Sequence, residues 1–140
     1  MKFSSVRSVS AASSIDAQAL TADETGDGVD LQGYEEALIV AQVGTTTTTL
    51  NNTNHVTLEV EESDDGTTWN DVAAGDLVGA ESPGVIKDLD ADADKESVFL
   101  ASYIGNKQHI RVHYNEHGTV ASLPIAICVI RGRPQTAPPA

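Results

Sequence analysis

Two segments of the chain alternate apolar and polar residues so regularly that they are expected to form β-strands with one buried face. Residues 55–62 place every second, aliphatic side chain on one side of the segment, and residues 108–114 repeat the pattern. Successive side chains of a strand point to opposite faces, so a period of two predicts two half-buried strands. The residues predicted to face inward are Val56, Leu58, Val60, Ile110, Val112 and Tyr114.

Further short apolar segments, separated by turn residues, extend this pattern along the chain. Residues 34–43 and 97–103 have the composition of strands, and Ser63-Asp64-Asp65-Gly66 is typical of a tight turn. The segment Leu123 to Ile130 is apolar on both faces, which places it either between two sheets or beneath another subunit. The absence of a convincing long amphipathic helix favours an all-β fold, either a β-sandwich or a jelly-roll-like barrel.

The chain length of 140 residues fits one domain, with weakly patterned segments at both ends. Residues 1–28 are rich in Ser, Ala, Thr and Asp, and we expect a flexible arm there, although a short helix over residues 15–20 is a competing interpretation. Residues 29–133 form the predicted β domain, and the Pro-rich residues 134–140 form an extended tail. The candidate interaction residues of the arm are Phe3, Val6, Arg7 and Val9.

Four residues are predicted to share one core, namely Trp69, Ile110, Val112 and Ile127, because aromatic and aliphatic area is most valuable when it is buried. The single cysteine, Cys128, lies in an apolar run and cannot form a disulfide within the chain.

Charge is distributed unevenly. The formal net charge is −13, and residues 8–106 hold 20 of the 21 acidic groups with only Lys87 and Lys95 as bases. An acidic body repels phosphate groups, so we expect no nucleic-acid partner. No apolar run approaches the roughly 20 residues of a membrane span, and the first ten residues lack the apolar core of a signal peptide. We therefore expect a soluble protein made in a cytoplasm.

The search for reactive groups finds no catalytic constellation, so we expect neither an enzyme nor a cofactor. Asp90, Asp92 and Asp94 alternate along an acidic segment and are weak candidates for calcium, but Lys95 stands where a calcium loop of the EF-hand type needs glycine. His109 and His113 are predicted to point outward from one strand about 13 Å apart, too far to share one metal ion.

Two stretches of the chain carry distinctive motifs. They are Leu58 to Trp69, which includes the Ser-Asp-Asp-Gly turn, and Tyr103 to Val112, which reads Tyr-Ile-Gly-Asn-Lys-Gln-His-Ile-Arg-Val. Both stretches resemble small structural proteins encoded near the major capsid gene of tailed bacteriophages. The resemblance covers about residues 29–133, and one departure is His109, where Tyr is common. It implies a virion protein, and specifically a capsid decoration (cement) protein that binds the outside of the assembled shell. The implied partners are the major capsid protein and further copies of the chain, with a trimer as the expected oligomer.

Two other classes remain open from the sequence. A tail or head-completion component would share this composition. A carbohydrate-binding sandwich would need exposed aromatic residues on a sheet face, and the chain holds only Trp69 and five Tyr or Phe residues.

Overall fold

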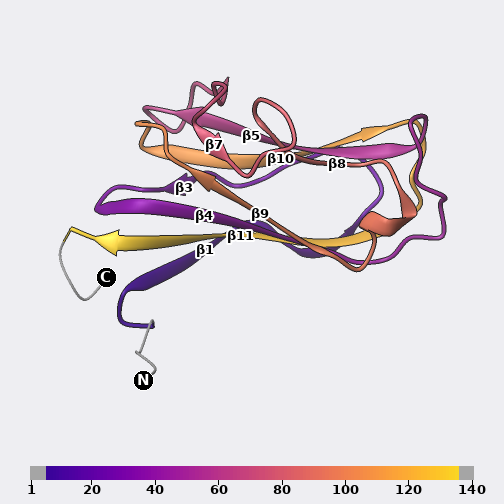
Figure 1. Cartoon of the computed structure of the whole chain (residues 1–140), viewed down its shortest axis with the longest axis horizontal. Helices are drawn as coiled ribbons and strands as arrows, with labels where there is room; N and C mark the ends of the chain where they lie inside the picture. The colour runs from indigo at the N-terminus through magenta and orange to yellow at the C-terminus, as the bar shows by residue number, and fades with distance from the viewer. Residues whose placement is uncertain (1–5, 136–140) are drawn as a thin grey trace.

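The computed structural model describes residues 6–135, which form two antiparallel β-sheets packed face to face (Figure 1). Sheet A orders its strands as β1 (Val9–Leu20), β11 (Leu123–Pro134), β4 (Tyr34–Val43), β9 (Val98–Tyr103) and β7 (Leu77–Val78). Sheet B orders β2 (Glu24–Thr25), β10 (His109–His117), β5 (His55–Ser63) and β6 (Asn70–Asp71). In addition, β3 (Val29–Asp30) pairs with β10, and β8 (Val85–Leu89) pairs with β5. The all-β sandwich predicted from the sequence is confirmed.

A single 3₁₀ turn, η1 (Asp92–Asp94), lies between β8 and β9. Within residues 6–135 there is no helix long and apolar enough to cross a membrane.

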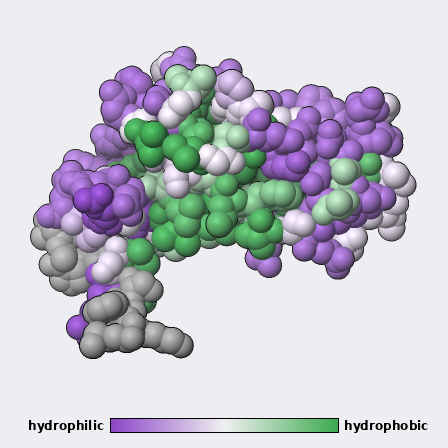
Figure 2. All heavy atoms as spheres, in the orientation of Figure 1, coloured by the Kyte–Doolittle hydropathy of each residue, from purple (hydrophilic) through white to green (hydrophobic). Residues whose placement is uncertain are grey.

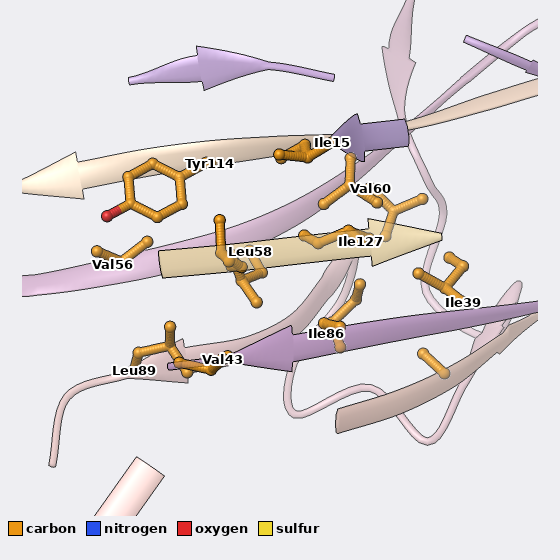
Figure 3. Close-up of a cluster of buried hydrophobic side chains, with 14 of the residues drawn as sticks. Ile15, Ile39, Val43, Val56, Leu58, Val60, Ile86, Leu89, Tyr114 and Ile127 are labelled. Carbon is orange, nitrogen blue, oxygen red and sulfur yellow. The ribbon is translucent and has the colours of Figure 1, made fainter. Parts of the chain in front are cut away.

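The core lies between the two sheets and is built by the alternation that the sequence predicts. Strands β5 and β10 pair along their whole length, from His55 opposite His117 to Ser63 opposite His109. Every second residue of β5 and β10 points toward sheet A. The inward-facing aliphatic side chains of sheet A pack against these residues (Figure 3). The largest fully buried side chains include Ile15, Ile39, Leu58, Leu89, Ile110, Tyr114, Leu123 and Ile127.

Residues 9–28 do not form the predicted arm, and residues 15–20 do not form a helix. Strand β1 pairs with β11 from Val9 opposite Gly132 to Leu20 opposite Leu123, with two register shifts on the way. Ile15 is only 2% exposed and belongs to the core. The strand forms because β11 is apolar on both faces and offers a long edge on which even a weakly patterned segment gains backbone hydrogen bonds. The folded unit therefore includes residues 9–28 as well as the predicted domain from residue 29.

The arm residues have different surroundings. Val6 is 77% exposed and Arg7 is exposed, whereas Val9 is half-buried at the start of β1. Phe3 lies outside the described residues. At the other end, β11 continues to Pro134, which pairs with Tyr34, and the Gln135 N–H donates to the Gly33 carbonyl at 2.8 Å. The rest of the predicted tail, residues 136–140, also lies outside the described residues.

The core prediction is wrong for Trp69. Ile110, Val112 and Ile127 are fully buried, but Trp69 is only partly buried and takes no part in the core cluster. The Arg111 guanidinium stacks over its ring at 4.3 Å from the ring centre. Arg111 points away from the core on β10, so Trp69 packs on the outer side of sheet B. An aromatic ring can lie on the surface of a sheet when it is partly buried and a cation packs over its face.

The Ser63–Gly66 turn has the geometry that its residues predict. The Asp65 carboxylate accepts hydrogen bonds from the backbone N–H groups of Thr67 and Thr68, both at 2.9 Å. The Ser63 hydroxyl accepts from the N–H of Gly66 at 2.9 Å, and Gly66 has a positive φ of 75°. Side chains that bond nearby backbone groups in this way stabilise a turn.

The Asp65 carboxylate makes the stability of this turn depend on pH. The backbone hydrogen bond from Thr68, followed by that from Thr67, holds the pKa of Asp65 well below its ordinary value of 3.8. Because the folded-state pKa is lowered, the stabilisation is fully present above the unfolded-state pKa and is lost as the pH falls below it. We expect Asp65→Ala to destabilise the protein at pH 7, with a difference from wild type that shrinks below about pH 3.8.

Urea unfolding of both proteins from pH 7 to pH 2 measures this difference. Asp71→Ala, an exposed carboxylate on sheet B, is the control and should show no comparable change over the same range. A difference between wild type and Asp65→Ala that stays constant into the acid range would contradict the assignment.

Candidate functional site

The acidic candidates for calcium do not form a coordination site. Asp92 accepts a hydrogen bond from the Leu50 N–H at 3.0 Å and pairs with Lys95 at 2.7 Å. Asp94 accepts from the Ala91 N–H at 3.1 Å and lies 3.7 Å from the Lys87 ammonium, while Asp90 is exposed. The carboxylates of Asp92 and Asp94 hold the loop around η1. Among residues 6–135, no group of three or more His, Cys, Asp or Glu side chains is placed to hold a metal ion.

All four histidines of the chain lie on the outer face of sheet B. His109 and His113 point outward from β10, as predicted, and β10 extends as far as His117 on the same face. The pairing of β10 with β5 places His55 directly opposite His117. The rings of His55 and His117 stack with centres 4.3 Å apart. The local sequence does not reveal this pair, because it depends on the register between two strands that are remote along the chain.

The His55–His117 pair belongs to a hydrogen-bonded cluster around a buried threonine. His55 Nδ1 lies 2.6 Å from the Asp88 carboxylate, and His117 Nε2 lies 3.1 Å from the Thr57 hydroxyl. A threonine beside a histidine could serve as a nucleophile only where a substrate can reach it. Thr57 is 8% exposed and also bonds Asp88, so its hydroxyl is a structural link between β5, β8 and β10.

The two motifs that carry the phage resemblance meet at one end of the sandwich. The Tyr103 hydroxyl donates to the Glu62 carboxylate at 2.7 Å, and the Lys107 ammonium contacts the Asp64 carboxylate at 2.8 Å. Burial, followed by the hydrogen bond to Glu62, raises the pKa of Tyr103 well above its ordinary value. Gly105 is required because a side chain there would collide with the Tyr103 ring and hydroxyl. The motif residues therefore fasten the end of β9 in sheet A to the end of β5 in sheet B.

The most distinctive surface of the molecule is the outer face of sheet A. In one row across this sheet, Cys128 lies opposite Val40, which lies opposite Leu100. In the next row, Ile130 lies opposite Leu38, and Ser102 and Val78 continue the row. A third row joins Ala126, Gln42 and Val98. Paired residues share a face, and their sequence neighbours point into the core, so these three rows face away from sheet B.

We call this surface the apolar face. Its members are Leu38, Val40, Val78, Val98, Leu100, Ile104, Ala126, Cys128 and Ile130. Four of them are more than half exposed: Val78 at 53%, Val98 at 57%, Leu100 at 54% and Ile104 at 62%. Figure 2 shows hydrophobic residues gathered over β4, β9 and β11, with hydrophilic residues toward both ends of the molecule.

Charged side chains surround the apolar face without entering it. None of its three rows, all of them within the described part of the chain, contains an acidic or basic residue. The nearest charges at one end are Glu35, Glu36 and Arg133, which pair loosely with one another at 3.6 and 3.8 Å. Two open hollows of about 460 and 440 Å³ lie toward the two ends of the face, the first lined by Leu38, Ile104 and Ile130 and the second by Gln42, Pro124 and Ala126.

An exposed, contiguous aliphatic surface of this kind is typical of sites that contact other molecules, because scattered apolar residues are normal on a protein surface but clusters are not. The sequence signal for it is the segment Leu123 to Ile130, whose apolar character on both faces predicts either a second sheet or another subunit above it. Sheet B covers one face of this segment. Within residues 6–135, no element covers the other.

Comparisons with known proteins give little further guidance. No protein-family model matches the chain, and no curated protein matches it. Among solved structures, the chain is similar to a protein described as "Crystal structure of infectious bursal disease virus VP2 subviral particle", with 8% sequence identity and a TM-score of 0.38. The match covers 91% of this chain and 32% of that protein, so the chain spans about a third of its length.

Proposed function

We propose that this protein is a virion structural protein of a tailed bacteriophage that decorates the outer surface of the assembled icosahedral capsid and stabilises it. The observation that carries the proposal is the apolar face of sheet A, which is exposed on an otherwise polar and acidic domain. A domain with such a face works as a component of an assembly, because burying the face against neighbours is favourable by roughly 25 cal/mol per Å².

Two further features support a structural role. The polar clusters of the described residues link strands to each other, as at Thr57 and Asp88, where the threonine hydroxyl is buried. The two segments that resemble phage structural proteins are joined through Glu62, Tyr103, Asp64 and Lys107, so the resemblance rests on residues that hold one end of the sandwich together. We propose that the chain acts without catalysis and without a cofactor.

The proposed mechanism is stabilisation by preferential binding. A protein that binds the assembled shell, but not its dissociated subunits, shifts the equilibrium toward the shell by RT ln(1 + [L]/Kd) for each occupied site, or about 2.7 kcal/mol at a hundredfold excess over Kd. We propose the major capsid protein as the partner and a closed homo-oligomer, a trimer on threefold positions, as the binding unit. The net charge of −13 would steer it to basic patches of the shell.

The proposal predicts that the purified protein adds to preassembled shells that lack it. We expect saturable occupancy, measured by sedimentation and gel densitometry, and a rise in the temperature of shell disruption that levels off when the sites are filled. Salt near 1 M, where the Debye length is about 3 Å, should slow association more than it loosens the bound state.

An unrelated acidic β-protein of similar size and charge is the control, and it should not co-sediment. A chain that never co-sediments with shells but is recovered with isolated tails would instead be a tail or head-completion component. Recovery on immobilised glycans would make it a carbohydrate-binding module. Either result would overturn the decoration proposal.

A further inference from the structure

We infer that a second copy of this chain covers the apolar face of sheet A, so that this face is the contact between copies in the free oligomer rather than the surface that meets the shell. The inference deepens the proposed function, and it rests on that function only in treating the chain as a building block. Its physical basis is the composition, charge and exposure of the face.

The outward-facing residues of sheet A are as apolar as residues on the buried face of a sheet. Along β4 the outward residues Leu38 and Val40 alternate with the inward residues Ile39 and Ala41, and along β11 the outward Cys128 and Ile130 alternate with the inward Ile127 and Val129. Strands that are buried on both faces show this continuous apolar sequence. Interfaces between permanently associated copies resemble a domain core cut in half, whereas contacts with separate partners are about as polar as the remaining surface.

Charge distinguishes a second copy from an oppositely charged partner. Two copies that each carry −13 repel one another, and this repulsion is weakest where neither presents a charge. The three rows of the apolar face meet this condition. A basic shell surface that recognised the acidic body would be met by carboxylates, and these lie elsewhere on the molecule.

The solubility of the free protein before it binds a shell also favours a second copy. Such a protein must stay dispersed in solution until shells are available. Val98, Leu100 and Ile104 are each more than half exposed in the single chain, and an aliphatic surface of this kind promotes aggregation if it stays uncovered. A second copy covers this surface as soon as the chain has folded and so prevents aggregation.

The test is the oligomeric state of the full chain with a single charge placed on the face. Wild type should sediment as a multiple of the 14.7 kDa chain. Leu100→Asp should weaken self-association by about a hundredfold or more, because a buried unpaired carboxylate is costly at an interface, while the exposed position leaves the fold intact. Asn70→Asp adds the same charge at an exposed site of sheet B and should leave the oligomer unchanged.

Cys128 provides an independent readout, since it is the only cysteine, it is partly exposed, and it lies in the middle row of the face. We expect its reaction with a small thiol reagent to slow at least tenfold when wild-type protein is concentrated from the dissociated to the associated range. In Leu100→Asp it should stay fast at both concentrations. Val98→Lys, also at an exposed position, repeats the test with the opposite charge, and far-ultraviolet circular dichroism confirms that each variant is folded.

The inference and the proposed function fail in different ways. A wild-type chain that stays monomeric, with Cys128 equally reactive at all concentrations, overturns the inference. So does an oligomer that survives both Leu100→Asp and Val98→Lys in folded form. If the monomer still binds shells and Leu100→Asp abolishes that binding, the face belongs to the shell contact and the proposed function stands. If the oligomer forms as expected but does not bind shells, the inference stands and the proposed decoration role is wrong.

Discussion

Ile127→Ala is expected to lower the free energy of unfolding by about 3 kcal/mol, within the range of about 2 to 5 kcal/mol typical of large-to-small changes in a core. Ile127 has no exposed surface and lies on β11, an interior strand of sheet A, between Ile15 on β1 and Ala41 on β4. Its side chain points at sheet B, so its truncation leaves a cavity that backbone hydrogen bonds on both sides of β11 prevent from closing. Urea unfolding followed by circular dichroism measures the change.

Val98→Ala is the matched control, because it removes aliphatic atoms from sheet A at a position that is 57% exposed. In the dissociated chain its cost should be well under that of Ile127→Ala, since little buried surface is lost. Equal costs for the two substitutions would mean that the outer face of sheet A is as buried in the single chain as the inner face, and would contradict the sandwich described above.

Ser14→Ala is expected to destabilise the protein by about 2 kcal/mol through a lost hydrogen-bond acceptor rather than a cavity. The Ser14 hydroxyl accepts from the Val112 N–H at 3.0 Å and donates to the Asp27 carbonyl at 3.0 Å, and Ser14 is 2% exposed. It thus joins β1 of sheet A to β10 of sheet B. Without the hydroxyl, the buried N–H of Val112 has lost its partner, and a buried unsatisfied donor costs about 1 to 3 kcal/mol.

Ser13→Ala, one residue earlier, is the control, because Ser13 is exposed on the outer face of sheet A and should tolerate the change. Amide hydrogen exchange supplies a local readout. The Val112 amide should exchange faster in Ser14→Ala than in Ser13→Ala by more than the change in global stability accounts for. Equal exchange at this amide in the two variants would show that the serine does not hold the two sheets together.

The same site explains why glycine stands at position 26. The Gly26 N–H donates to the Val112 carbonyl at 2.8 Å, and a side chain at Gly26 would lie 2.5 Å from both that carbonyl and the Ser14 hydroxyl. Three segments that are far apart in the sequence therefore cross at one buried point. Nothing in the local sequence of Ser14 or Gly26 predicts this crossing, which is why residues 9–28 were expected to be an arm.

The sequence by itself determined the features that depend on residues close to one another along the chain. The alternation in β5 and β10 set which side chains face the core, the residues of Ser63 to Gly66 set a turn, and the apolar character of Leu123 to Ile130 indicated a strand with apolar side chains on both faces. Each of these follows from the two-residue period of a strand or from hydrogen bonds between residues two or three apart.

The tertiary structure decided what depends on pairing between remote segments. The register of β5 with β10 stacks His55 on His117, the free edge of β11 recruits the weakly patterned β1, and Arg111 holds Trp69 outside the core. The apolar face likewise arises only when β4, β9 and β11 lie side by side, because no one of these strands carries enough exposed aliphatic surface to form it. Such contacts depend on which strands pair and in which register, and this is settled by the burial of the whole core rather than by local preference.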